Sequence, residues 1–449
     1  MSKYILEGSF TDIERHITQE NGTIKVQIPF LDVNNSFCFG IDKSLRELYA
    51  CGIHPTEDGL DILCLAALVY LADTRISRNI HSEDCWSREI CINLPVYNID
   101  KWNGLEKIFT RMLGFLTGDL WKISFEKREI AFFGNTTETV DCNQYDVVTL
   151  FSGGMDSLIG TINSLRDNKK IALISHAGES YTKKTQRDLL SHLQYRYPDS
   201  ILTRFDLGMV FKKDLLPNGG IENSTRSRSF LFIAYGIFTL TGIKGTSVLH
   251  VPENGLIALN VPLDELRVGS YSTHTTHPFY LEQWNYVLEH LELALSLSNP
   301  YWNKTKGDMA NECLDKDFLL SAISSSSSCS SPQKERWNGS SPKQCGYCVP
   351  CLIRRAAMAK AFGINSDPTH YSVIDISEII SNRSKKKGTQ IRSFQIAINK
   401  IKLHPTKAKT FIHKSGPICG TSEYLKELAD VYKRGLKEVD SFIQAYVEN

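Results

Sequence analysis

The sequence predicts an α/β protein whose centre is a doubly wound parallel sheet, preceded by an N-terminal α+β unit and followed by a mostly helical C-terminal extension. Apolar runs alternate with helical patterns between residues 145 and 251, which is typical of parallel strands joined by crossover helices. A turn with two glycines follows the first of these runs, and the chain ends in a long amphipathic helical pattern. We therefore divide the chain into residues 1–142, 143–365 and 366–449.

The length and charge of the chain limit its class. A chain of 449 residues is longer than one hydrophobic core supports, so two or three domains are expected. Its 51 Lys and Arg residues against 50 Asp and Glu leave a net charge of +1, which provides no overall field for nucleic acid or a membrane. There is no cationic leader followed by an apolar run, and no run of about 18 uncharged apolar residues. We expect a cytoplasmic protein with no membrane partner and no nucleic-acid partner.

The N-terminal unit combines short alternating runs with helical patterns. IKVQIPFLDV at 24–33 alternates, whereas 58–76 and 102–116 show helical periodicity. No glycine loop and no metal-ligand spacing occurs in this unit. Two pieces rich in polar and aromatic residues, at 84–90 and 116–121, are interpreted as packing and turn chemistry rather than as a ligand site.

Strands and helices alternate in the central unit. The expected strands are residues 145–151, 169–177, 200–208 and 245–251. The expected helices are residues 157–167, residues 181–197 and a long apolar helix that begins near Ser227. In a doubly wound fold, ligands bind at the carboxyl ends of the strands.

A serine-rich stretch with Pro and Gly, residues 324–344, predicts a mobile loop. A helix at 351–363 then leads into the extension, which contains a basic stretch at 383–409 and an amphipathic helix at 422–446. The basic stretch has a single aromatic residue and no recognised nucleic-acid-binding module, so it indicates a solvated face or a surface for a partner protein rather than an RNA site.

The stretch LFSGGMDS closes the first central strand and opens the next helix. Glycines allow the backbone to turn sharply and approach an anion without a Cβ, and a helix N-terminus adds partial positive charge. The pattern predicts a cradle for phosphate oxygens, although a two-glycine turn is also a common connection between a strand and a helix. The cradle residues would be Leu150, Phe151, Ser152, Gly153, Gly154, Met155, Asp156 and Ser157.

The string SGG-x-DS after a strand resembles the PP-loop, or ATP pyrophosphatase, family, and differs from the GxxxxGK[ST] of other phosphate loops. With the later features included, the resemblance covers about residues 145–362. It implies an adenine nucleotide alpha hydrolase-like fold and cleavage of ATP between the α and β phosphates, which leaves an adenylate for a nucleophile to displace. It also implies that Asp156 orients the loop or helps to hold Mg²⁺, and that the pyrophosphate is held by Ser152, Gly153, Gly154 and Ser157.

Basic groups are expected opposite this cradle. Arg226 and Arg228 lie at the start of the long apolar helix, where their guanidinium groups could reach phosphate oxygens. A solvated helix start is the alternative, and the family has an arginine before the matching helix, which favours Arg228. Lys306 is a weaker candidate of the same kind. His176, after the second strand, falls where the family contacts the nucleotide, and a capping role is its alternative.

Four of the twelve cysteines form a spaced group: Cys329, Cys345, Cys348 and Cys351. Four thiolates satisfy tetrahedral Zn²⁺ and leave no open position, so the spacing predicts a structural zinc site. A third cysteine in the C-x2-C-x2-C register disfavours a redox pair. An iron–sulfur cluster uses the same ligands, and spacing alone does not exclude it.

The distal cysteine, the C-x2-C-x2-C run and the helix LIRRAAMAKAF together resemble the QueC-like branch of the family, the 7-cyano-7-deazaguanine synthases. These enzymes use ATP to activate a 7-deazaguanine carboxylate, which ammonia converts to an amide and a second ATP-dependent step to a nitrile. QueC proper lacks the N- and C-terminal units, and its substrate-pocket string is not found here, which puts a free nitrile product in doubt.

The extended arrangement resembles QatC, the QueC-like component of Qat anti-phage operons, in the pieces LTGDLW, ENGLIALNVPL, STHTTHP and YKRGL. The resemblance implies a deazaguanine-type ligand and a protein partner from the same defence operon, whose amine could replace ammonia. One alternative is another PP-loop ligase that modifies tRNA or nucleotides, for which Cys313 would be the metal-free cysteine. The other is a non-catalytic scaffold that binds a nucleotide.

Polar side chains also follow the fourth central strand: Glu253, Asn254, Asn260, His274 and His277. A carboxylate and an amide there could bind the edge of a purine-like base, and the histidines could relay a proton. The alternative is that Asn254 makes a turn and that residues 272–278 cap the helix that follows. Because these groups gather where the fold places its ligand, we predict a substrate pocket.

Overall fold

The fold is given by a computed structural model of the whole chain. It describes residues 3–11, 14–133, 145–176, 178–222, 224–267, 274–330, 332, 341–381 and 387–447. The predicted boundary at residue 142 lies outside the described residues. Within the described part, no helix is both long and apolar enough to cross a membrane.

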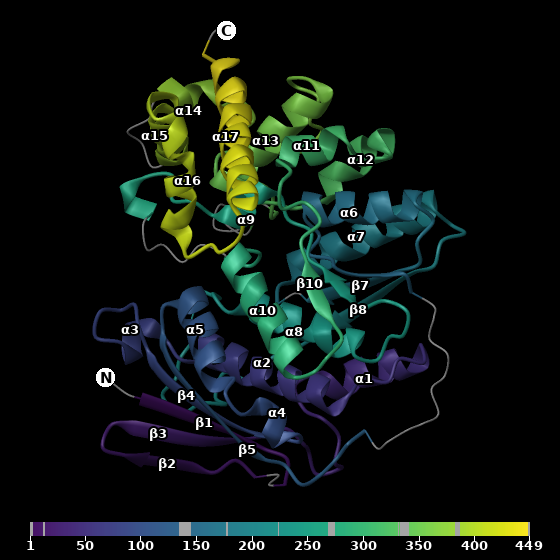
Figure 1. Ribbon diagram of the computed structural model, residues 1–449, viewed down its shortest axis with the longest axis vertical. Coiled ribbons are helices and arrows are strands. Elements are labelled where there is room, and N and C mark those ends of the chain that lie inside the picture. The colour runs from purple at the N-terminus through teal and green to yellow at the C-terminus, as the bar shows by residue number, and fades with distance from the viewer. Residues whose placement is uncertain are drawn as a thin grey trace.

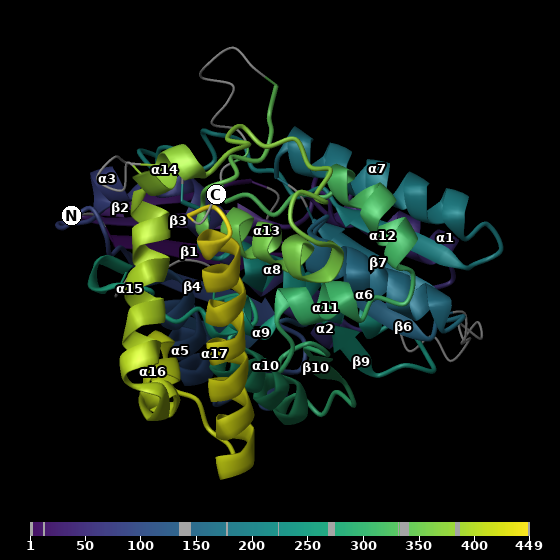
Figure 2. The ribbon, with the colours of Figure 1, turned by 90° about the horizontal axis from the view of Figure 1, so that it is seen from above.

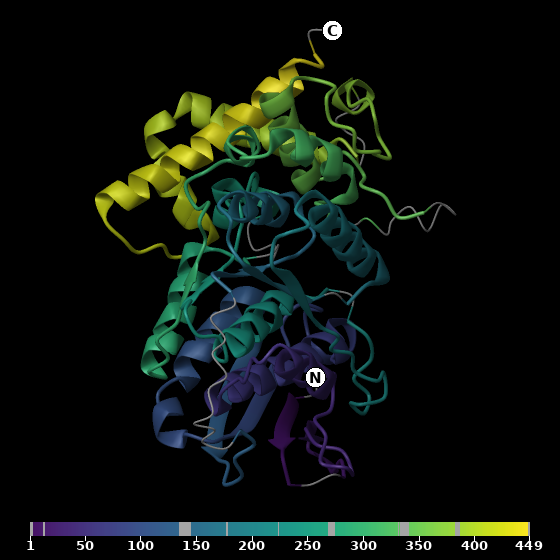
Figure 3. The same ribbon diagram turned by 90° about the vertical axis from the view of Figure 1, so that its right-hand side faces the viewer.

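Two five-stranded sheets are stacked along the long axis of the molecule, with helices between and above them (Figures 1 and 3). The N-terminal sheet lies at the bottom of Figure 1, the central sheet lies above it, and the C-terminal helices lie at the top. In both sheets, the strands alternate with helices along the chain, which confirms an α/β architecture.

The N-terminal sheet has the order β2-β3-β1-β4-β5. Its strands are β1 (Lys3–Ser9), β2 (Ile17–Glu20), β3 (Thr23–Pro29), β4 (Glu89–Val96) and β5 (Leu120–Lys127). The helices of this region are α1 (Ile41–Ala50), α2 (Glu57–Arg75), α3 (Arg78–His81), α4 (Ile99–Trp102) and α5 (Glu106–Thr117). The predicted helices at 58–76 and 102–116 correspond to α2 and to α4 with α5.

The expected α+β character of this unit is wrong, because four of the five strands run parallel. Only β2 is antiparallel, and it pairs with β3. Helices α1 and α2 connect β3 to β4, and α5 connects β4 to β5, as crossovers between parallel strands require. The alternating run at 24–33, on which the prediction was based, contains most of β3, and such alternation is more typical of antiparallel sheets.

The central sheet is entirely parallel, in the order β10-β9-β6-β7-β8. Its strands are β6 (Val147–Leu150), β7 (Ile171–His176), β8 (Leu202–Leu207), β9 (Val248–His250) and β10 (Ser296–Ser298). The four predicted strands are confirmed. The fifth, β10, was missed because three residues with one apolar side chain carry no periodicity.

Helices cover both faces of the central sheet, as a doubly wound fold requires. The helices α6 (Met155–Arg166) and α7 (Ser180–Arg196) pack on Ile171 and Leu173 of β7. On the other face, α8 (Arg228–Leu240) and α10 (Pro278–His290) pack with Ala172 and Ile174. The same hydrophobic core continues through α2 to the N-terminal sheet, so α2 is buried on all sides.

The C-terminal extension is helical and packs above the carboxyl ends of the central strands (Figure 1). It comprises α14 (Ser377–Ser381), α15 (Thr389–Leu403), α16 (Ala408–Phe411) and α17 (Ser422–Gln444). Helices α15 and α17 run side by side (Figure 2). They share a core with α9 (Gly255–Leu259) and α13 (Val349–Phe362). The remaining short helices are α11 (Lys306–Asn311) and α12 (Lys316–Ala322).

Candidate functional site

The glycine turn lies at the point where the central sheet changes direction. The chain passes from β6 to β7 on one side and later to β9 on the other, so strand order read from β8 is 3-2-1-4-5. In such sheets, the crevice at the carboxyl end of the first strand is the usual ligand site. Residues 151–154 follow β6 directly and lead into α6, so the turn occupies this crevice.

Gly153 is required by the shape of the turn. Its φ of +82° lies in the left-handed region, which side chains with a Cβ rarely adopt. A Cβ on Gly153 would also lie 3.1 Å from Thr185 Cγ2 and 3.2 Å from Gln186 Cγ of α7. Both the backbone conformation and the contact with α7 therefore exclude a larger residue.

The hydroxyl groups of the turn lie next to each other. Ser152 Oγ accepts a hydrogen bond from the Gly154 amide at 3.2 Å, and it lies 3.3 Å from Ser157 Oγ. Ser157 Oγ in turn donates to the Gly154 carbonyl at 3.0 Å. The side chains of the other cradle residues, Leu150, Phe151 and Met155, are buried in the core. If they contact a ligand, they do so through their backbone.

Beneath the turn, four predicted residues converge on one buried cluster. Lys306 Nζ lies 2.6 Å from Asp156 Oδ1, and Asn254 Nδ2 donates to Asp156 Oδ2 at 2.8 Å. Asn254 Nδ2 also lies 3.3 Å from Glu253 Oε1. Asp156 and Lys306 are 4% and 5% exposed, so the pair is shielded from water. The sequence placed these residues at different points of the chain, and the fold brings them together.

The two carboxyl groups of the cluster share one proton. Burial opposes ionisation of Asp156, but Lys306 and hydrogen bonds from Glu253 and Asn254 outweigh it and lower the Asp156 pKa to about 2. Burial, and then the charge of Asp156, raises the pKa of Glu253 well above its usual value. These opposite shifts favour the ionised form of Asp156 and the protonated form of Glu253.

The two candidate arginines have different surroundings. Arg226 donates to the Thr117 carbonyl at 2.7 Å and lies 4.2 Å from the centre of the Trp86 ring, so it is directed at the N-terminal region. Arg228, half-buried at the first position of α8, makes no hydrogen bond or ion pair with any described residue. Helix α8 begins at the carboxyl edge of the sheet, so Arg228 is the cation available there.

The start of α8 is held by the N-terminal region. Asp73 of α2 accepts a hydrogen bond from the Ser227 amide at 2.7 Å. The same carboxylate lies 3.0 Å from Arg88, which also pairs with Asp119 at 2.6 Å. Arg88 and Asp119 come from the two pieces interpreted as packing chemistry, and that interpretation is confirmed, because both side chains are buried.

His176 is fully buried at the end of β7. Its Nδ1 lies 2.9 Å from the Leu207 carbonyl, so Nδ1 carries the proton and Nε2 is the acceptor. Among the described residues, Nε2 has no hydrogen-bond partner, and the Tyr70 ring of α2 contacts the imidazole edge-on with 5.5 Å between ring centres. Burial lowers the pKa of His176 to about 4, so the ring is neutral at pH 7.

The remaining predicted substrate residues lie away from the Asp156 cluster. Asn260 ends α9 with a φ of +47°. His277 accepts from the Phe279 amide as the N-cap of α10, which confirms the capping alternative for this residue. His274 packs on the Phe115 ring at 4.4 Å between centres. Burial lowers the pKa of His274 to about 4 and that of His277 to about 3. Residues 272 and 273 of the same piece lie outside the described residues.

The four cysteines of the spaced group come together as a metal-ligand set. Their sulfur atoms all lie within 4.8 Å of one another. Amide groups of Cys345 and Cys348 point at the sulfurs of Cys329 and Cys345, at 3.5 and 3.3 Å. Such N–H···S contacts support thiolates. The arrangement is compatible with zinc, and four thiolates leave no coordination position for a substrate.

The cysteine group is connected to the glycine turn through the serine-rich stretch. The Ser327 amide donates to the Gly153 carbonyl at 2.9 Å. Arg354 of α13, fully buried, donates to Ser326 Oγ at 2.8 Å and to the Ile323 carbonyl at 2.7 Å. The start of the predicted mobile loop is therefore packed structure, whereas residues 331 and 333–340 lie outside the described residues.

Two side chains that shape this site, Gln186 and Glu438, were not predicted from the sequence. Gln186 of α7 donates to the Phe151 carbonyl at 3.2 Å and supports the turn from behind. The sequence pattern could have identified Gln186, because it lies on the apolar face of α7 with Leu189 and Leu193. A glutamine buried there needs a hydrogen-bond partner. Glu438 of α17 contacts the residues on both sides of Lys306, and no local pattern marks it.

A scan against protein-family models and a search of curated proteins both returned no match. The resemblance to PP-loop enzymes therefore depends on the residues of the turn, the cysteine group and the site just described.

Proposed function

We propose that the protein is an ATP-dependent ligase of the PP-loop type, similar to QueC. It splits ATP into AMP and pyrophosphate while it adenylates a 7-deazaguanine carboxylate, and then transfers the activated group to an amine. In this proposal, the amine comes from ammonia or from a partner protein of the same anti-phage defence operon, and the complex works in the cytoplasm.

One observation carries the proposal: the glycine turn lies at the switch point of a 3-2-1-4-5 sheet, directly above a buried Lys306–Asp156 pair. The amides and hydroxyls of Ser152, Gly153, Gly154 and Ser157 suit the oxygens of a departing pyrophosphate. Arg228 would meet the charge that develops there, and no covalent enzyme intermediate is needed.

The cysteine group fits a zinc ion. Zn²⁺ would be held by Cys329, Cys345, Cys348 and Cys351. It would stabilise the serine-rich stretch, which is hydrogen-bonded to the glycine turn. Mg²⁺ would neutralise phosphate charge, and Asp156 is the carboxylate among the cradle residues. Since both oxygens of Asp156 are engaged by Lys306 and Asn254, its role in the free enzyme is to orient the start of α6.

The tRNA-modifying alternative needs a reactive cysteine, and Cys313 is poorly suited. Its side chain is 5% exposed, and burial raises the pKa of its thiol to about 11. A thiol of this kind stays protonated at neutral pH and is a weak nucleophile. We therefore favour transfer to nitrogen.

The test is the nucleotide product formed with Mg²⁺, ATP and 7-carboxy-7-deazaguanine, with ammonium or the co-expressed operon partners as the amine source. We expect AMP and pyrophosphate, and at least a hundredfold loss in Ser152→Ala. Ser164→Ala is the matched control, because Ser164 lies near the end of α6, away from the glycine turn, and its hydroxyl donates to the Gly160 carbonyl within the helix. Formation of ADP, or no turnover at all, would support the scaffold alternative instead.

A further inference from the structure

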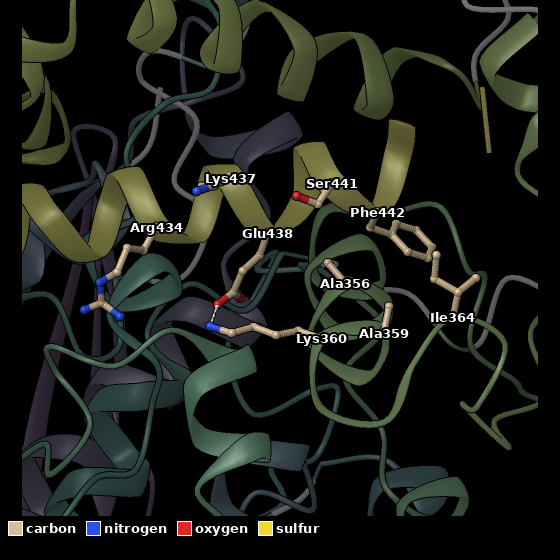
Figure 4. A pocket seen from close by; sticks show the side chains of 9 residues that line it. All are labelled: Ala356, Ala359, Lys360, Ile364, Arg434, Lys437, Glu438, Ser441 and Phe442. Carbon is tan, nitrogen blue, oxygen red and sulfur yellow. Dashed lines mark hydrogen bonds and ion pairs between the residues drawn. The ribbon is translucent and has the colours of Figure 1, made fainter. Parts of the chain in front are cut away.

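The C-terminal helix α17 reaches the residues that flank Lys306. Glu438 of α17 has a side chain only 9% exposed. Its carboxylate accepts hydrogen bonds from the Gly307 amide at 3.2 Å and from the Thr305 hydroxyl. It also pairs with Lys360 of α13 at 2.7 Å, which Figure 4 shows across the space between α13 and α17.

The first turn of α11 is also held by ion pairs of Asp308. Thr305 and Asp308 form a capping box at the start of α11. Asp308 pairs with Lys360 at 2.6 Å and with Arg434 of α17. We call Glu438, Lys360, Asp308 and Arg434 the C-terminal clamp. It grips the first turn of α11 from the side of the C-terminal extension.

Gly307 makes this grip possible. A Cβ on Gly307 would lie 2.7 Å from both Glu438 Oε2 and Lys360 Cδ, closer than such atoms approach. The absence of a side chain at this position lets Glu438 reach the backbone of α11 directly. Since α11 has only six residues, it depends on such contacts for its position.

Lys306 lies between the clamp and the glycine turn. Its backbone belongs to the turn that Glu438 holds, and its ammonium lies 2.6 Å from Asp156 in α6. A lysine has four rotatable bonds, so a fixed backbone is needed to keep the ammonium in one place.

We propose that Glu438 is a positioning residue for the nucleotide site. It fixes the first turn of α11, this turn fixes Lys306 against Asp156, and the C-terminal helix α17 is thereby an integral part of the site. The effect on nucleotide binding rests on the proposed function, whereas the effect on Lys306 itself does not.

The clamp is open to substitution because it borders solvent. Lys360, Arg434 and Glu438 line a cavity of about 460 Å³ between α13 and α17 (Figure 4). The side chains of Lys360 and Arg434 are 36% and 38% exposed. A Glu438→Ala variant therefore leaves groups that water can reach, and we expect it to fold. Glu438→Gln, which keeps the shape of the side chain, is the second variant.

The first measurement is the acetylation rate of Lys306 in the nucleotide-free full-length protein, mapped by mass spectrometry. Lys306 should react slowly in the wild type because it is buried and ion-paired. We expect its acetylation to rise at least fivefold in Glu438→Ala and less in Glu438→Gln. Lys437→Ala is the matched control, because Lys437 is an exposed neighbour on α17 without an ion pair to the described residues. An unchanged rate in both Glu438 variants would overturn the proposal.

The second measurement is a double-mutant cycle on the affinity for α,β-methylene-ATP with Mg²⁺. Glu438→Ala and Lys306→Ala should each weaken binding about tenfold, and the double variant should be no weaker than Lys306→Ala. If the loss of affinity in the double variant equals the product of the two single losses, Glu438 acts independently of Lys306, which would contradict the proposal. If the wild type does not bind the analogue, the proposed function fails, and the acetylation result still decides the role of Glu438.

Discussion

Two of the predicted cations, Arg228 and Lys306, are anchored from opposite ends of the molecule, and the anchors differ in burial. Arg228 begins α8, whose first amide is held by Asp73 in a network with Arg88, Arg78 and Asp119. We call this network the N-terminal anchor. Lys306 is held by the C-terminal clamp.

The N-terminal anchor is almost completely withdrawn from water, with Arg88 and Asp73 both 0% exposed. In the C-terminal clamp, Lys360 is 36% exposed. Breaking a buried ion network strands a charge in the core, whereas a half-exposed network can exchange its partners for water. The comparison indicates that the N-terminal region is inseparable from the central sheet, and that the C-terminal extension is the adjustable side of the site.

The largest expected effect is on the N-terminal anchor. Arg88→Ala leaves Asp73 and Asp119 buried without their main partner, so we expect a loss of about 3–5 kcal/mol in the free energy of unfolding. Urea denaturation of the full chain measures this loss. Arg46→Ala, which removes an exposed pair with Asp42 on α1, is the control and should change little. Equal effects of the two changes would contradict the buried character of the anchor.

Removal of the metal should destabilise the packing around the cysteine group. We expect about one zinc per chain by elemental analysis, and its loss in Cys348→Ser, because three remaining thiolates bind zinc weakly. The exposed Cys419→Ser should keep the metal. Iron with a visible absorption band would instead identify an iron–sulfur cluster. A stable metal content in Cys348→Ser would show that the cysteine group is not the ligand set.

The next effect separates the two arginines. Arg228→Ala should lower kcat for AMP formation about a hundredfold with little loss of stability, because the guanidinium has no partner in the described protein. Arg226→Ala should leave kcat nearly unchanged and lower stability slightly, since Arg226 contacts Thr117 and Trp86. The reverse pattern of kcat and stability would assign the phosphate role to Arg226.

The smallest effect is the pH response of the C-terminal clamp. Hydrogen bonds and charge from Lys360, with those from Thr305, outweigh burial and lower the pKa of Asp308 from 3.8 to about 2. Its contribution to stability is therefore present above about pH 4 and is lost as pH falls toward 2. Asp308→Asn lacks this contribution at every pH. The difference in unfolding free energy between the two proteins should shrink over this range, and a constant difference would contradict the assignment.

Local patterns predicted the elements that local physics controls. The turn at Gly153 and the strand before it were found from residues 145–157 alone, because a buried strand, two glycines and a helix start are adjacent in the chain. The cysteine group was found in the same way, since three of its members lie within seven residues. The alternating run at 24–33, by contrast, is compatible with either strand direction, so the N-terminal sheet was misassigned.

By itself, the sequence determined which residues form the glycine turn, which cysteines can share a metal, and where most helices and central strands lie. These features depend on neighbours a few residues apart. Only the tertiary structure decided that Asn254 and Lys306 meet Asp156, that Asp73 caps α8, and that Glu438 grips the turn beside Lys306. Each of these contacts joins residues roughly a hundred or more positions apart, and a hydrogen bond over such a separation exists only once the packing of whole helices has fixed both partners.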